Sequence, residues 1–72
     1  MALKCIDISA LKNALQREYS ISPDDNQMGK SIFRIQGVIC TVFTNGSVQI
    51  QGQNNPTVIR HIEMTVETIN SL

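Results

Sequence analysis

The sequence predicts one α+β domain over residues 1–72, with a helix, a three-stranded antiparallel sheet and a second helix in that order. Before residue 20 and after residue 56, apolar residues recur every three or four positions, as on one face of a helix. Between residues 31 and 51 they alternate, as in strands. A 72-residue chain has the size of one small domain.

The first expected helix begins near residue 8 and ends at Tyr19 or Ser20. Either Asp7 or Ser9 is a suitable N-cap. A polar turn follows the helix and includes Pro23.

Three strands are expected at residues 31–36, 38–44 and 47–51, with Gly37 at the first break. Asn45-Gly46 at the second break is typical of a two-residue type I′ turn, which needs positive φ at both positions. A two-residue loop places Phe43 opposite Val48. Paired residues share a face, so the expected core face carries Ile39, Thr41, Phe43, Val48 and Ile50. The expected open face carries Cys40, Val42, Thr44, Ser47, Gln49 and Gln51.

The second expected helix follows Asn55 as N-cap and Pro56 at its first position. Its apolar stripe repeats at helical spacing and consists of Val58, Ile62, Val66 and Ile69.

Composition limits the classes of function. Six Lys and Arg balance six Asp and Glu, so the net charge is zero. Two cysteines without a CxxC motif favour reduced thiols, and no apolar run approaches a membrane span or a signal peptide. We therefore expect a cytoplasmic protein without a membrane partner.

Catalytic and metal-binding patterns are weak. His61 is the one imidazole, and neither Cys5 nor Cys40 has basic neighbours that activate a thiol. Asp24-Asp25 lacks the spacing of a calcium loop, and the four glycines stand singly. We expect no enzyme activity, no metal and no cofactor.

The hairpin from Val42 to Gly52 resembles the strand–turn–strand–Gly segment of a TATA-box-binding-protein repeat. Ile6-Asp7-Ile8 with the helix to Tyr19, and then Pro23, resembles that family's first helix and its exit. Ile32-Phe33-Arg34-Ile35 is similar to the long strand that follows. The same fold occurs in the N-terminal domain of type 3 bacterial ribonuclease H. The resemblance implies a single half-domain whose helices back a curved sheet, with Gln49 and Gln51 at the family's DNA-contacting positions.

Two classes of function follow as expectations. The first is a non-enzymatic module that binds DNA or RNA through the open sheet face, as a homodimer that restores the family's two repeats. The second is a small protein that binds and inhibits a macromolecular partner, such as an antitoxin or a phage anti-defence protein. For either, the expected contacts are Gln49, Gln51, Val42, Cys40 and Thr44, with Phe33 or Arg34 depending on the register at Gly37. A merely solvated sheet face is the plain alternative.

Overall fold

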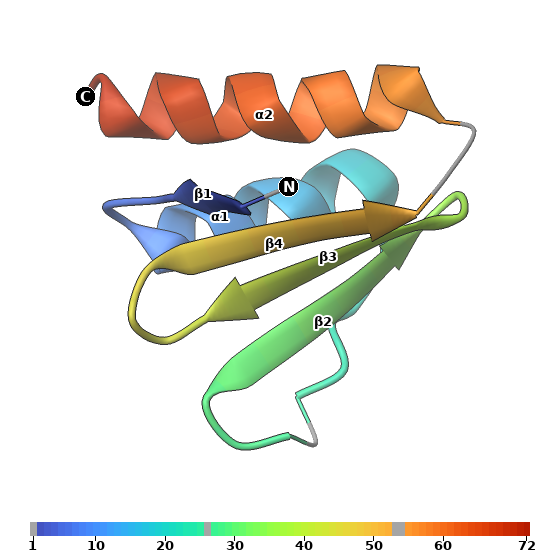
Figure 1. Ribbon diagram of the computed structural model, residues 1–72, viewed down its shortest axis with the longest axis horizontal. Helices are drawn as coiled ribbons and strands as arrows, with labels where there is room; N and C mark the ends of the chain where they lie inside the picture. The colour runs from blue at the N-terminus through green and yellow to red at the C-terminus, as the bar shows by residue number, and fades with distance from the viewer. Residues whose placement is uncertain (1, 26, 53–54) are drawn as a thin grey trace.

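The computed structural model describes residues 2–25, 27–52 and 55–72. The described residues form four strands and two helices. In Figure 1, α1 lies behind the strands and α2 lies beside β1. Their bounds are β1 Ala2–Lys4, α1 Ile8–Tyr19, β2 Lys30–Ile35, β3 Val38–Phe43, β4 Ser47–Gly52 and α2 Pro56–Asn70. The α+β class is confirmed, but the described residues form a four-stranded sheet rather than the expected three-stranded one.

The fourth strand, β1, pairs antiparallel with β4 at one edge of the sheet, giving the order β1-β4-β3-β2. The Asn70 side chain at the end of α2 helps to hold it there. Its Nδ2 donates to the Lys4 carbonyl at 2.8 Å, and its Oδ1 accepts from the Ile6 amide at 2.9 Å. A three-residue strand is too short to show an alternating pattern in the sequence. Its position in the sheet follows from its pairing with β4 and from these hydrogen bonds to Asn70.

Side-chain caps fix where both helices begin. The Asp7 carboxylate accepts from the Ala10 amide at 3.1 Å, which makes Asp7 rather than Ser9 the N-cap of α1. The Asn55 side chain accepts from the Val58 amide at 3.2 Å, with Pro56 following it as predicted. α1 ends at Tyr19, and its C-cap Ser20 has a left-handed φ of 53°.

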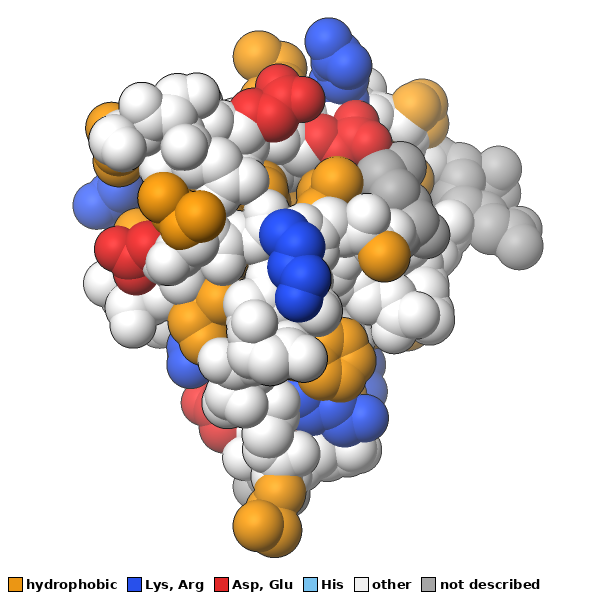
Figure 2. Space-filling view, turned by 60° about the vertical axis from the view of Figure 1, so that its left-hand side comes forward, with side chains coloured by type: hydrophobic (Ala, Val, Ile, Leu, Met, Phe, Trp, Pro, Cys, Tyr) orange, Lys and Arg blue, Asp and Glu red, His pale blue; other side chains and the backbone are white. Residues whose placement is uncertain are grey.

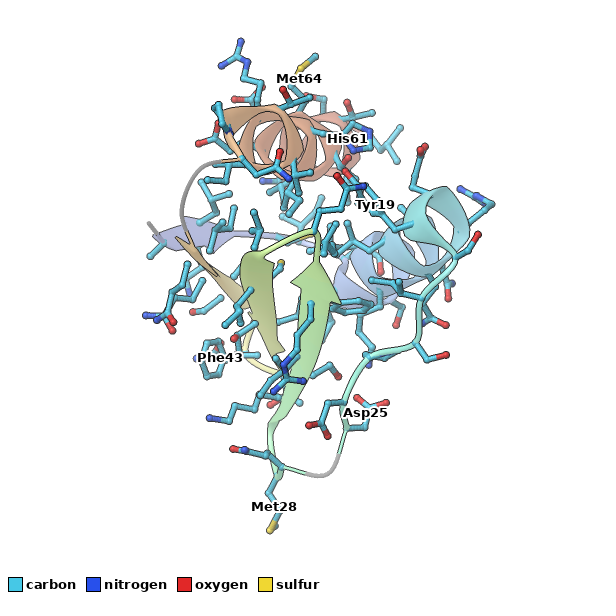
Figure 3. All side chains as sticks on the ribbon, turned by 90° about the vertical axis from the view of Figure 1, so that its right-hand side faces the viewer. Tyr19, Asp25, Met28, Phe43, His61 and Met64 are labelled. Atoms are coloured by element: carbon cyan, nitrogen blue, oxygen red, sulfur yellow. The ribbon has the colours of Figure 1, made fainter. Side chains whose placement is uncertain are left out.

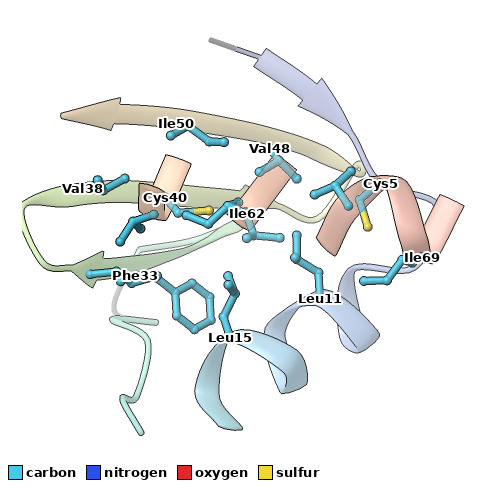
Figure 4. Close-up of a cluster of buried hydrophobic side chains, with 14 residues drawn as sticks. Cys5, Leu11, Leu15, Phe33, Val38, Cys40, Val48, Ile50, Ile62 and Ile69 are labelled. Atoms are coloured by element: carbon cyan, nitrogen blue, oxygen red, sulfur yellow. The ribbon is translucent and has the colours of Figure 1, made fainter. Parts of the chain in front are cut away.

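The core lies between the two helices and one face of the sheet (Figure 4). Phe33 is the largest fully buried side chain of this core, and α1 contributes Leu11 and Leu15 to it. The predicted stripe of α2 faces this core, because all four of its members are buried. The sheet contributes Phe33, Ile35, Val38, Cys40, Val42, Val48 and Ile50.

The predicted register of the second hairpin is wrong by one residue. Val42 pairs with Val48, so the loop has three residues, Thr44 to Gly46. Only Gly46 has positive φ in this loop, and its amide donates to the Phe43 carbonyl at 3.0 Å. This pattern is a type I turn followed by a left-handed glycine. An Asn-Gly pair fits such a three-residue loop as well as it fits a type I′ turn.

The two-residue turn with positive φ at both positions lies instead between β2 and β3. Gln36 has a φ of 49° and Gly37 a φ of 89°, and Ile35 pairs directly with Val38. The register of both hairpins then places Val38, Cys40 and Val42 of β3 under the helices. A shift of one residue moves every side chain of a strand to the other face, so Ile39, Thr41 and Phe43 lie on the open face.

Candidate functional site

The face of the sheet opposite the helices, called the open face below, is the candidate site. Figure 3 shows Phe43 on the side of the strands that points away from α1. Four strands contribute side chains to the open face, in three rows that run across the sheet. They are Lys4, Ser47, Phe43 and Lys30 in the first row, Ala2, Gln49, Thr41 and Ile32 in the second, and Gln51, Ile39 and Arg34 in the third.

Three of the predicted contact residues lie on the open face. Gln49 and Gln51 are exposed on β4, as expected. Arg34 is exposed on β2, which decides the alternative between Phe33 and Arg34. Thr44 is exposed too, but in the turn at the end of the hairpin rather than on a strand.

The other three predicted contact residues belong to the core. Cys40 and Phe33 have no exposed surface, and Val42 is 2% exposed. Cys40 and Val42 were assigned from a two-residue loop, and the three-residue loop turns both toward the helices. Phe33 pairs with Cys40 and therefore shares its face. None of the three can touch a ligand on the open face of the folded chain.

An apolar strip runs along β3 in the middle of the open face. Ile39 is 37% exposed and Phe43 is partly buried, with Thr41 between them at 9% exposure. Ile32 lies beside Thr41 on β2 and is also partly buried. Among the residues that the structure describes, Phe43 offers the one aromatic ring of this face.

The open face carries a net positive charge, although the chain is neutral. Lys4, Lys30 and Arg34, half of the six Lys and Arg residues, lie there. The Asp24 backbone forms an isolated antiparallel β-bridge with Ile32 at the edge of β2. The Asp24 carboxylate lies 3.8 Å from the Arg34 guanidinium. The Arg34 side chain is 66% exposed, so this weak contact leaves it open to a ligand.

The remaining acidic residues lie away from this face. The Ser31 hydroxyl, on the core side of β2, donates to the Asp25 carboxylate. The others are on the helices or at the α1 cap, namely Asp7, Glu18, Glu63 and Glu67. The helices also carry Lys12, Arg17 and Arg60. The open face therefore carries an excess of positive charge, and the helical side an excess of negative charge.

The space-filling view shows how these groups share the surface. In the lower half of Figure 2, a large hydrophobic side chain lies beside Lys and Arg side chains, with polar atoms around them. The hydrophobic groups are separate from one another in this view rather than joined in one patch. A ligand on this surface meets apolar, cationic and amide groups within a short distance.

A concavity, which the sequence did not indicate, lies between the two helices. It has a volume of about 420 Å³ and is lined by Ala10, Ala14, Arg17, His61, Met64, Thr65, Thr68 and Ile69. Beside it, the Tyr19 hydroxyl and His61 Nδ1 are 2.7 Å apart and hydrogen-bonded. Burial, with a smaller contribution from Glu18, raises the pKa of Tyr19. Ala10 and Ala14, two small residues four apart on α1, were the sequence signal that could have indicated this concavity.

Both thiols are free and buried. Burial raises the pKa of Cys40 from 9.0 to about 12, which is opposite to the change that activates a nucleophile. The Cys5 thiol donates to the Asp7 carbonyl at 3.4 Å. Among the residues that the structure describes, no three His, Cys, Asp or Glu side chains are placed to hold a metal ion.

No helix in the described part of the chain is both long and apolar enough to cross a bilayer. In comparisons with known proteins, no family model, no curated protein and no solved structure matches this chain significantly.

Proposed function

We propose that the chain is a non-enzymatic module that binds nucleic acid through its open face. The observation that carries this proposal is the row Lys4, Ser47, Phe43 and Lys30, in which an aromatic ring lies between two cations. Cations attract phosphates, and an aromatic ring stacks on a base, so the row offers a contact for each part of a nucleotide.

The rest of the open face suits the same ligand. Arg34 adds a third cation, an exposed one, at the other end of β2 from the half-buried Lys30. Gln49 and Gln51 are exposed amides that both donate and accept hydrogen bonds, as the edges of bases do. The contact set proposed here is therefore Phe43, Lys4, Lys30, Arg34, Gln49 and Gln51.

We also propose that the fold is a single half-domain of the TATA-box-binding-protein type, acting as a homodimer. The order of elements and the two helices on one face of an antiparallel sheet support the first part. A second copy would supply the second repeat that a two-repeat protein of this family carries in one chain. Light scattering at several protein concentrations measures the dimer directly, and a monomer at all of them refutes it.

Two triple variants with equal charge loss test the nucleic-acid proposal. Lys4→Gln, Lys30→Gln and Arg34→Gln remove the cations of the open face. The matched control, Lys12→Gln, Arg17→Gln and Arg60→Gln, removes the three cations of the helices. Fluorescence polarization with labelled DNA and RNA at several salt concentrations is the assay.

We expect the wild-type chain to bind with a dissociation constant between about 1 and about 100 µM at physiological salt, and more tightly at low salt. Three phosphate contacts predict that log K falls with log salt at a slope of about −2 to −3. The open-face triple variant abolishes this salt dependence, whereas the helix variant keeps it. Equal losses in both variants, or no binding by the wild type, refute the proposal.

A protein partner is the second candidate, and one observation favours it. Ile32, Ile39 and Phe43 are apolar side chains on the open face, and polar and charged residues surround them, as in many protein interfaces. A chain that binds no oligonucleotide but co-purifies with one host protein, and loses it on Ile39→Gln, supports this inhibitor-type function instead.

A further inference from the structure

We infer that the nucleic acid bound by the open face is single-stranded. This inference rests on the proposed function and specifies its ligand. Three features of the sheet carry it: its width, the position of its aromatic ring and the small number of its cations.

The width of the sheet does not match a groove of duplex DNA. Neighbouring strands lie about 4.8 Å apart, so the axes of the outer strands β1 and β2 are about 14 Å apart. The minor groove of B-DNA is about 6 Å wide, and the major groove, about 12 Å wide, admits a helix or a two-stranded ribbon. A four-stranded face enters neither groove unless the duplex is opened.

The position of Phe43 favours unpaired bases. Its ring lies within the open face, with Lys30 paired to it on β2 and with Ser47 and then Lys4 on its other side. A ring on the face of a sheet stacks on a base only when that base is not stacked between its neighbours. In a single strand the bases are free to do so, and stacking on an aromatic side chain is the usual mode of contact.

The charge of the open face is too small to hold an opened duplex. Proteins that open the minor groove compensate for lost base stacking with a wide, wrapped contact. Here three cations are available, Lys30 and Arg34 about 13 Å apart along β2 and Lys4 about 14 Å across from Lys30. Three phosphates of one flexible strand reach such positions without a distorted helix.

Substitutions of Phe43 separate stacking from simple apolar contact. Phe43→Leu keeps an apolar side chain of similar size and loses the ring, whereas Phe43→Trp keeps a stacking surface. The control, Met64→Leu, lies on α2, far from the open face, at a residue that is 51% exposed. Urea unfolding of each variant confirms that it is folded before binding is measured.

The binding assay uses a labelled 12-nucleotide DNA, the RNA of the same sequence and the corresponding DNA duplex. We expect at least one of the single strands to bind at least ten-fold more tightly than the duplex. Phe43→Leu weakens single-strand binding between about 5-fold and about 100-fold, the range measured for one stacked base. Phe43→Trp and Met64→Leu stay within about two-fold of wild type, and the salt slope stays unchanged because no charge is lost.

The outcomes distinguish the single-strand inference from the proposal that the open face binds nucleic acid. If the duplex binds as tightly as the single strands, or if Phe43→Leu has no effect, the single-strand inference is wrong while nucleic-acid binding stands. If no oligonucleotide binds even at low salt, the proposed function fails and the inference fails with it. A preference for DNA or for RNA supports the inference in either case and identifies the sugar.

Discussion

Among the glycines, Gly52 is the position where an added methyl group is expected to lower the free energy of unfolding most. It ends β4, pairs with Val38, and has a φ of 120°. A Cβ at Gly52 would lie 2.6 Å from the Gly37 carbonyl oxygen and 2.8 Å from the Val38 Cα. Both atoms belong to the backbone, so neither can rotate away as a side chain does.

The expected magnitude follows from two contributions. A side chain in a disfavoured backbone region costs about 1 to 3 kcal/mol. Forcing atoms into occupied space costs a further ~1 to ~3 kcal/mol. Gly52→Ala should therefore lower the free energy of unfolding by about 2 to 5 kcal/mol, after a gain of about 0.4 to 1 kcal/mol from the stiffer unfolded chain. A 72-residue domain has only about 4 to 11 kcal/mol in total.

Gly37→Ala is the matched control, because Gly37 also has positive φ, at 89°, but no atom lies within 4 Å of its Cβ position. It bears the backbone cost alone, so we expect a loss of about 1 kcal/mol. Urea unfolding followed by circular dichroism measures both variants. Equal losses would show that the close contact at Gly52 contributes nothing, and a stable Gly52→Ala would refute the reasoning altogether.

Two further predictions concern β1 and the buried thiol. Asn70→Ala should lower the free energy of unfolding by about 1 to 2 kcal/mol and speed amide exchange in β1, because two hydrogen bonds to Lys4 and Ile6 are lost. Asn13→Ala on the exposed side of α1 is the control. An equal effect of both variants would contradict the role of Asn70 in holding β1. Cys40 releases its proton near pH 9 when unfolded and near pH 12 when folded, so above pH 9 the unfolded chain binds fewer protons and stability falls as pH rises. Urea unfolding between pH 8 and pH 11 should show a steeper fall for wild type than for Cys40→Ala, by at most about 1.4 kcal/mol per pH unit, and parallel curves would count against it.

The helices were predictable because their signals are local. Asp7, Asn55 and Pro56 act within one turn of the helix that they begin. The apolar stripe of α2 repeats over about three turns, which leaves one orientation toward a core. Helix positions and buried faces could therefore be taken from the sequence, apart from the choice between two caps.

The sheet was less predictable because its register depends on two turns at once. Asn45-Gly46 fits a two-residue and a three-residue loop, and the dipeptide alone does not choose between them. β1 was missed because its three residues acquire their place from β4 and from Asn70, which is distant in sequence. The groove between the helices was missed because it needs residues of both helices together.

The one-residue change of register strengthens the functional argument rather than removing it. In the predicted register, the open face combined amides with Cys40 and Val42, small side chains that suit a core as well as a ligand. In the observed register, those two are buried and Phe43 takes a place beside Lys30. Gln49 and Gln51 keep their position, because β4 faces the same way in both registers. The same chain thus gains an aromatic ring next to a cation on its open face, and this pair is what makes nucleic acid a better expected ligand than the sequence alone implied.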